Sequence, residues 1–166
     1  MRWSRFVPGA LLALGGVLAC GGVVSCGGDD EGPPRVTFAA AGGSVTATPT
    51  QYCDVQVQDC RADPDAAVAL RVPPGTPIEV SVPSSVSEAP WQVVFRYRTP
   101  DGTKTQARSN VFAAGQRSSY TLTPPAEDAQ LETVEVQQFG TSMVPREDGV
   151  DFATRATWVL SIDDRT

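Results

Sequence analysis

The chain has no histidine, and its 166 residues include a single lysine, Lys104, and a single asparagine, Asn110. Histidine is the most frequent general base and metal ligand in proteins, so its absence disfavours imidazole-based triads and the usual zinc sites. The serines consequently have no histidine to activate them as nucleophiles. We predict that the protein is not an enzyme and that it uses no cofactor and no metal.

Paired carboxylates are the remaining route to catalysis. Glu132 and Glu135 are close in sequence, as are Glu147 and Asp148, but glycoside hydrolysis needs two carboxyl groups across a cleft at a defined separation. The two-residue period of a strand places Glu132 and Glu135 on opposite faces. An envelope hydrolase is therefore the least favoured function.

The N-terminus has the layout of an export signal. Arg2 and Arg5 precede an uncharged run, residues 6–28, and the first acidic residue is Asp29. Residues 23–26, Val-Val-Ser-Cys, resemble the site at which a bacterial lipoprotein is cleaved and lipidated on cysteine. We predict a lipoprotein signal peptide over residues 1–25, lipidation of Cys26, and a location on the extracytoplasmic face of the plasma membrane.

Two alternatives to this processing stay open. Cleavage before Cys20 is the first, although Leu18 stands where such sites prefer a small or β-branched residue, and Cys26 would then be left as a free thiol. The second is an uncleaved membrane anchor, because residues 6–28 are long enough to cross a bilayer core of about 30 Å. Pro8 and the paired glycines make this run a poor permanent span.

Residues 26–34 comprise the lipidated cysteine and a short polar tether, and residues 35–166 form one domain. Cleavage removes Arg2 and Arg5 from the 13 basic residues and none of the 19 acidic ones, so the net charge changes from −6 to −8. An acidic, exported domain is a poor candidate for nucleic-acid binding. The partners we expect are the membrane, through the lipid, and another envelope protein.

From residue 35 onward, short runs rich in valine, threonine and aromatic residues alternate with proline, glycine and aspartate, which is typical of an all-β sandwich. We predict a single immunoglobulin-like antiparallel β-sandwich. The expected strands are residues 35–40, 44–47, 67–72, 77–82, 91–98, 105–112, 118–123, 131–138 and 152–162. The Thr-Pro-Asp-Gly sequence at 99–102 predicts a hairpin turn, because proline presets φ and glycine accepts a positive φ.

Residues 91–98 form the clearest strand. Trp91, Val93, Phe95 and Tyr97 share one face, and Gln92, Val94, Arg96 and Arg98 share the other. We expect the aromatic face to lie in the core, where each large side chain contributes about 1.5 to 3 kcal/mol. Trp158 lies on the apolar face of the last strand, and we expect the two tryptophan-bearing strands to face each other across the sandwich.

Cys53 and Cys60 are expected to form a disulfide, because an exported domain is in an oxidising compartment and the mature chain offers no further cysteine for a metal site and no histidine. Seven extended residue steps span about 23 Å, whereas bridged Cα atoms lie about 5.5 Å apart. The chain must therefore fold back between the two cysteines. A redox-active pair is the alternative, although the Cys-x-x-Cys spacing is missing.

Acidic residues gather around this segment, at Asp54, Asp59, Asp63 and Asp65. Calcium takes six to eight oxygen ligands, but the spacing does not match an EF-hand loop. Solvated or capping carboxylates are the simpler interpretation. Asp63 before Pro64 is also a suitable N-cap for a single helical turn.

A locally basic region interrupts the acidic chain. Arg96, Arg98 and Arg108 form a candidate binding face for phosphate or polysaccharide, with Lys104 and Arg117 nearby and Asp101 as the lone acid. An exposed strand face whose charges suppress edge-to-edge aggregation is the alternative, and we favour it.

Four stretches, at residues 49–54, 72–77, 90–97 and 131–138, together resemble a family of actinobacterial envelope lipoproteins known only as a domain of unknown function. The resemblance covers nearly the whole mature chain. It implies a small exported domain in a Gram-positive, mycolate-type or related envelope, and it transfers no catalytic residues. The function we expect is a non-catalytic protein-binding or accessory module, with a lipid- or glycan-binding carrier as the alternative.

Overall fold

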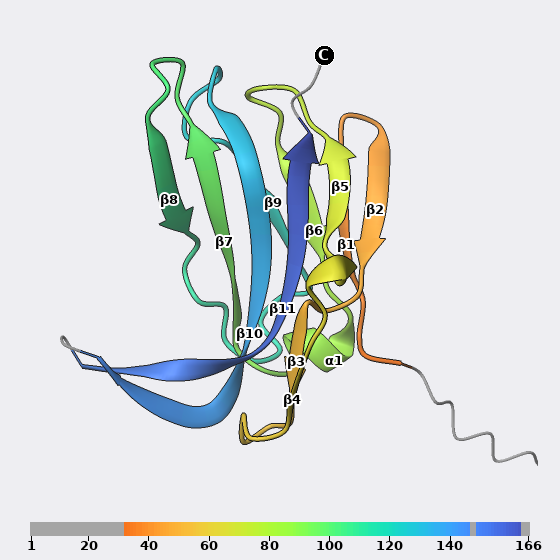
Figure 1. Cartoon of the computed structure of the whole chain (residues 1–166), viewed down its shortest axis with the longest axis vertical. Coiled ribbons are helices and arrows are strands. Elements are labelled where there is room, and N and C mark those ends of the chain that lie inside the picture. Colours follow the sequence, from red (N-terminus) through yellow and green to blue (C-terminus); the bar gives the residue numbers. More distant parts are fainter. Residues whose placement is uncertain (1–31, 147–148, 164–166) are drawn as a thin grey trace, which may run out of the picture. The chain divides into compact units, whose positions relative to one another are not determined.

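A computed structural model describes residues 32–146 and 149–163, which form a sandwich of two β-sheets (Figure 1). The smaller sheet has the strand order β2-β1-β6-β9, and the larger sheet has the order β4-β3-β11-β10-β7-β8. Strand β5 also belongs to the larger sheet, where it pairs with β11 in the one parallel pairing found among these residues. The all-β sandwich predicted from the sequence is confirmed.

The strands are β1 (Val36–Ala40), β2 (Gly43–Ala47), β3 (Gln51–Cys53), β4 (Cys60–Ala62), β5 (Val68–Arg71), β6 (Ile78–Ser81), β7 (Trp91–Arg98), β8 (Lys104–Arg108), β9 (Ser119–Leu122), β10 (Gln130–Arg146) and β11 (Gly149–Asp163). Two short helices, η1 (Pro64–Ala66) and α1 (Ser84–Ser87), interrupt them. Every predicted strand overlaps an observed one. The sequence did not predict β3 and β4, which have three residues each and too little alternation to be recognised.

The core lies between the two sheets. Trp91, Val93 and Phe95 of β7 are buried, as predicted from their shared face. Phe38 of β1 belongs to the same buried cluster on the side of the smaller sheet. The predicted placement of the tryptophans is wrong: Trp158 is also fully buried, but β7 and β11 are in the same sheet, on either side of β10. Periodicity assigns the tryptophans to the core face of a strand, but it does not say to which sheet the strand belongs.

The two predicted local turns are confirmed. The 99–102 turn joins β7 to β8, with Gly102 at φ 87° and its N–H donating to the Thr99 carbonyl at 2.9 Å. In the other, the Asp63 side chain caps η1 by accepting the N–H of Asp65 at 3.2 Å, and Pro64 occupies the first helical position.

Cys53 and Cys60 are joined by a disulfide and lie opposite each other in the β3–β4 hairpin. Their Cα atoms are 4.0 Å apart, so the chain folds back as the spacing requires. Residues 54–59 form the loop between them, which we call the disulfide loop.

One polar side chain enters the core end of the sandwich. Gln138 on β10 is 1% exposed, and its Nε2 donates to the carbonyl oxygens of Ser85 and Val86, at 2.9 Å each. These carbonyls belong to α1, and the last carbonyls of a helix need partners beyond its regular hydrogen bonds. The Val86 oxygen also accepts the backbone N–H of Ala89 at 3.3 Å. The contact fastens α1 to β10 and lets Val86 pack into the core.

Candidate functional site

Strands β10 and β11 form a long hairpin that continues past the sandwich (Figure 1). Their pairing shifts register between Gln138 and Phe139 and again between Phe139 and Met143. Such irregularities bend a strand and increase its local twist. The portion beyond the first shift, residues 139–146 and 149–154, is called the hairpin extension here.

The disulfide loop packs directly on this extension. Thr141 donates its backbone N–H to the carbonyl oxygen of Val55 at 3.0 Å, and the Ser142 hydroxyl donates to the carbonyl oxygen of Gln56 at 2.5 Å. Gly140 permits this approach, because an added Cβ would lie 2.8 Å from the Val55 oxygen and 2.6 Å from Val57 Cγ2. The disulfide and the extension are thus parts of one local structure.

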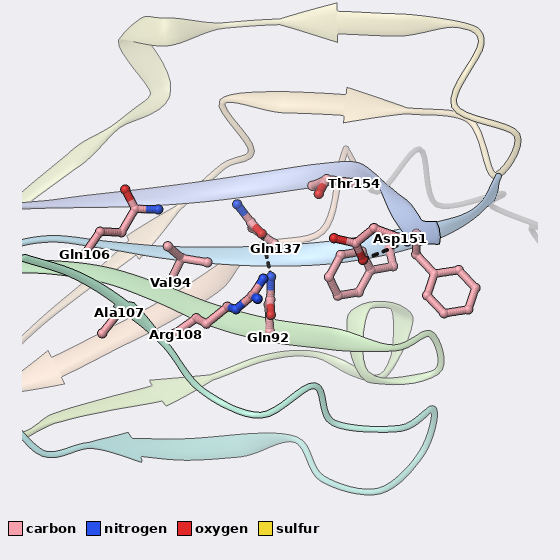
Figure 2. A pocket seen from close by; sticks show the side chains of 10 residues that line it. Gln92, Val94, Gln106, Ala107, Arg108, Gln137, Asp151 and Thr154 are labelled. Carbon is pink, nitrogen blue, oxygen red and sulfur yellow. Dashed lines mark hydrogen bonds between the residues drawn. The ribbon is translucent and has the colours of Figure 1, made fainter. Parts of the chain in front are cut away.

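A pocket of about 390 Å³ lies between the outer face of β7 and β8 and the first residues of β11 (Figure 2). The outer face is the face of the larger sheet that points away from the core. Side chains from all four neighbouring strands line the pocket: Gln92, Val94, Gln106, Ala107, Arg108, Gln137, Phe139, Asp151, Phe152 and Thr154. Its lining combines amides, one arginine, one carboxylate and two aromatic rings.

A chain of amide hydrogen bonds crosses the floor of the pocket. Gln92 Nε2 donates to Gln137 Oε1 at 2.9 Å, as Figure 2 shows, and Gln137 Nε2 donates to Glu135 Oε1 at 2.7 Å. Next to these amides, the Phe139 and Phe152 rings lie 6.3 Å apart between centroids. Phe139 is buried, whereas Phe152 is 43% exposed.

The structure places the three predicted arginines on one face, since Arg96 pairs with Gln106, Arg98 with Lys104, and Arg108 with Val94. Only Arg108 lines the pocket. Arg96 donates to the Thr133 hydroxyl at 3.2 Å. Arg117 lies elsewhere, with its guanidinium 4.7 Å from the centroid of the Phe112 ring.

Glu132 neutralises the part of this basic face that is formed by Arg98 and Lys104. Its Oε1 is 2.9 Å from Lys104 Nζ and 3.2 Å from Arg98 Nε. The expectation that Glu132 and Glu135 occupy opposite faces is wrong, because a register shift between Leu131 and Thr133 interrupts the alternation and lets Glu132 reach the outer-face cations.

Two carboxyl groups near this face have altered acidity. The hydrogen bond from Lys104, assisted by Arg98, lowers the pKa of Glu132 from its ordinary value of 4.5 in spite of partial desolvation. The Thr99 hydroxyl and then the Thr103 N–H lower the pKa of Asp101 within the β7–β8 turn. Both groups are therefore held as anions that stabilise local structure.

The acidic residues around the disulfide make local hydrogen bonds. Asp54 Oδ1 accepts the N–H of Gln58 at 2.7 Å, and Asp63 caps η1. Within residues 32–146 and 149–163, no group of three or more histidine, cysteine, aspartate or glutamate side chains is arranged to hold a metal ion.

A second, wider depression of about 1540 Å³ lies at the end of the sandwich where β1 begins, and Pro34, Tyr52, Arg61 and Arg155 are among its lining residues. Arg155 Nη2 donates to the Tyr52 hydroxyl at 3.2 Å, and the guanidinium lies 5.2 Å from the centroid of the Tyr52 ring. Arg155 Nε is buried and has no hydrogen-bond partner in the part of the chain that the structure describes.

The pocket contains residues that sequence reasoning missed, namely Gln92, Gln137, Asp151, Phe152 and Thr154. Two signals were present in the sequence. Gln92 lies on the polar face of the clearest strand, and a glycine inside a strand pattern, here Gly140, marks a bulge or a close backbone approach. Neither signal says which strand the bent hairpin approaches.

Cys26 lies outside the described residues, as do the rest of the predicted signal, the alternative anchor and the Glu147–Asp148 pair. None of the helices in the described part of the chain has the length and apolar character needed to span a bilayer.

The fold and the site define an all-β sandwich protein with a polar surface pocket and a projecting hairpin. The chain belongs to the family described as "Protein of unknown function (DUF2771)", whose sequence profile matches residues 29–163. The expected membership of a family of unknown function with actinobacterial relatives is confirmed.

The chain is 31% identical over 98 residues to an uncharacterised protein of Mycobacterium bovis and, equally, to one of Mycobacterium tuberculosis. The matched region is 58% of this chain and 56% of each relative, so it spans little more than half the length of those proteins. No solved structure matches the chain.

Proposed function

We propose that the protein is a non-catalytic binding module of the cell envelope that engages another envelope protein through its hairpin extension. The observation that carries this proposal is the cross-strand pair of Met143 and Phe152, which are 64% and 43% exposed. Methionine and aromatic side chains are enriched at protein interfaces, and aromatic residues often dominate their binding energy.

The extension is also pre-organised. The hydrogen bonds from Thr141 and Ser142 tie it to the disulfide loop, and that loop is closed by Cys53 and Cys60. A binding element that is already fixed loses less conformational entropy when a partner binds. The stapled hairpin therefore favours a specific interaction over a loose hydrophobic contact.

In this proposal, lipid on Cys26 holds the domain on the extracytoplasmic face of the plasma membrane after removal of residues 1–25. The export-signal layout of the N-terminus supports the placement, and a structural disulfide fits an oxidising compartment. Two or more acyl chains are needed for stable anchoring, and a mature lipoprotein carries that number. The domain itself is proposed to be immunoglobulin-like, which the two facing sheets support.

The carrier of lipid or glycan is the second candidate. It requires a concave pocket of about 300 Å³ or more. The interior between the sheets is filled by buried side chains, which disfavours a lipid enclosed in the sandwich. The concave sites lie on the surface instead, and the polar pocket favours a small polar ligand.

A photo-crosslinking amino acid at Met143, introduced in the native cell, tests the partner hypothesis. The matched control carries the crosslinker at Glu79, an exposed residue of β6 in the other sheet. We expect a specific envelope protein to be captured from position 143 and not from position 79. No adduct, or the same adducts from both positions, would contradict a partner at the extension.

The anchor has a separate test. Cys26→Ala should leave the precursor uncut or release the protein from the membrane, as measured by fractionation and by the mass of the mature N-terminus. Normal processing and full membrane retention of this variant would exclude lipidation at Cys26.

A further inference from the structure

Gln92 is only 5% exposed although it lies on the outer face of the larger sheet. A polar side chain on such a face is ordinarily in water, and burying it is costly unless it is hydrogen-bonded. Here the first residues of β11, among them Asp151 and Thr154, line the side of the pocket opposite Gln92 (Figure 2). The bent hairpin has converted a solvated sheet face into the floor of a pocket.

The orientation of the amides in this floor is fixed by Glu135. An ionised carboxylate only accepts hydrogen bonds, so Gln137 must present its NH₂ group to Glu135 and its oxygen to Gln92. The side-chain NH₂ group of Gln92 then donates one of its two hydrogens to Gln137. The other hydrogen of this NH₂ group and the side-chain oxygen of Gln92 make no hydrogen bond with the described residues. A donor and an acceptor are thereby held side by side at the pocket floor.

The walls add one charge of each sign. The side chain of Arg108 makes no hydrogen bond or ion pair with any residue in 32–146 or 149–163, and its guanidinium is not within 4 Å of the Asp151 carboxylate. Asp151 Oδ1 accepts the N–H of Phe152 at 2.9 Å, which orients the carboxylate. The Phe152 ring supplies an exposed apolar surface at the same site.

This combination selects among ligand classes. A phosphate ligand is disfavoured, because only one cation lines the pocket and Asp151 would repel it. An apolar ligand would leave the second N–H and the side-chain oxygen of Gln92, and the Arg108 guanidinium, without partners, which is unfavourable. A sugar ring carries hydroxyl groups that both donate and accept, together with C–H surfaces that pack on an aromatic ring.

We infer that this pocket, formed by Gln92, Gln137, Arg108, Asp151 and Phe152, binds a neutral saccharide. Its volume of about 390 Å³ lies at the lower end of the range for small-molecule sites, about 300 to 1,000 Å³, and suits one or two sugar residues. The ligand differs in class from the partner protein proposed above, so either proposal can fail without the other.

The test is an NMR titration of the full-length chain, labelled with ¹⁵N and held in a detergent without a sugar headgroup. The probes are the methyl glycosides of glucose, mannose and galactose, the disaccharide maltose, and inorganic phosphate. We expect at least one saccharide to shift the side-chain NH₂ signals of Gln92 and Gln137 in a saturable manner, and phosphate to leave them unchanged.

The saccharide affinity of the Arg108→Gln variant gives a quantitative test. Loss of a hydrogen bond to a charged group should weaken saccharide binding about tenfold. Arg96→Gln is the matched control, because Arg96 is on the same face but does not line the pocket. Gln92→Met tests the floor, and its dispersed amide spectrum would show that it folds. It should abolish saturable binding.

Three results would overturn the inference. The first is that no saccharide in the panel shifts the two glutamine signals at concentrations in the tens of millimolar, the affinity range of weak sites. The second is that Arg96→Gln weakens binding as much as Arg108→Gln. The third is that inorganic phosphate produces the saturable shifts and the saccharides do not.

Discussion

The backbone N–H of Thr141 in the hairpin extension donates a 3.0 Å hydrogen bond to the carbonyl oxygen of Val55 in the disulfide loop. The same oxygen accepts the Thr141 hydroxyl at 3.2 Å. Thr141 and Val55 are 86 positions apart in sequence, and their contact joins the bend of the β10–β11 hairpin to the disulfide loop. Phe152, which lines the pocket, pairs with Met143, two residues beyond this joint.

Gly140→Ala should disrupt the joint. The added Cβ would come within 2.8 Å of the Val55 oxygen, a backbone atom that cannot move aside without displacing the loop. Overpacking of this kind costs about 1 to 3 kcal/mol. We expect lower stability in urea denaturation and faster hydrogen exchange at the Thr141 amide.

Gly32→Ala is the control for Gly140→Ala, because a Cβ at Gly32 meets nothing within 4 Å. Wild-type stability and unchanged Thr141 exchange in Gly140→Ala would show that the loop does not lie against the extension as described.

Replacing both cysteines, Cys53→Ser with Cys60→Ser, should lower the free energy of unfolding by about 2 to 3 kcal/mol, the chain-entropy value for so small a loop. Because the loop supports the extension, the amide of Thr141 should lose protection to a greater extent than amides of β7. Equal loss of protection in both places would mean that the disulfide stabilises only the fold as a whole.

The strands of the sandwich were predictable because each has one buried face. Trp91, Val93 and Phe95 recur with a period of two, and that period specifies both the strand and its core side. What periodicity omits is pairing between distant strands. It therefore placed Trp158 in the opposing sheet, although β10 separates the two tryptophan strands within one sheet.

The pocket was less predictable than the fold. The basic face that includes Arg108 is predictable from the sequence. The expected placement of Glu132 and Glu135 on opposite faces is wrong, because the register shift between Leu131 and Thr133 interrupts the alternation. Gln92 lies on the face away from the core, as the period of its strand predicts, but it is buried there. Its burial comes from a bend in β10 and β11, and the position of such a bend depends on long-range contacts such as the one at Val55.

The ion pairs of Glu132 should make stability depend on pH in the acidic range. The pKa of Glu132 is lowered in the folded state, so the ionised carboxylate stabilises the fold above its unfolded value of 4.5. This contribution is lost as the pH falls through the lower folded value. Glu132→Gln should therefore be less stable than the wild type at pH 7, by up to about 1 kcal/mol for pairs near the surface, and the difference should shrink below pH 4.5.

Urea denaturation at several pH values measures this effect, with Glu79→Gln on the other sheet as a control that removes the same charge. The lowered pKa of Asp101 is common to all three proteins, so its contribution cancels in the differences. A stability difference for Glu132→Gln that stays constant from pH 7 to strongly acidic conditions would contradict the ion-pair assignment.

Trp158 connects the core to the segment that precedes β1. Its Nε1 donates to the carbonyl oxygen of Pro34 at 2.8 Å, while its ring is fully buried. Trp158→Phe removes this hydrogen bond and leaves a partial cavity, so we expect a loss of about 2 to 3 kcal/mol. The amides of Arg35 and Val36 should also exchange faster, because the chain ahead of β1 loses its attachment.

Trp91→Phe separates the two effects. Trp91 is equally buried and also donates to a backbone carbonyl, that of Arg117 at 3.2 Å, so its replacement should cost a similar amount of stability. Only Trp158→Phe should raise exchange at Arg35 and Val36 above the level set by global unfolding. If both variants raised it equally, Trp158 would act only through the core, and the tether would enter the domain without a fixed attachment at Pro34.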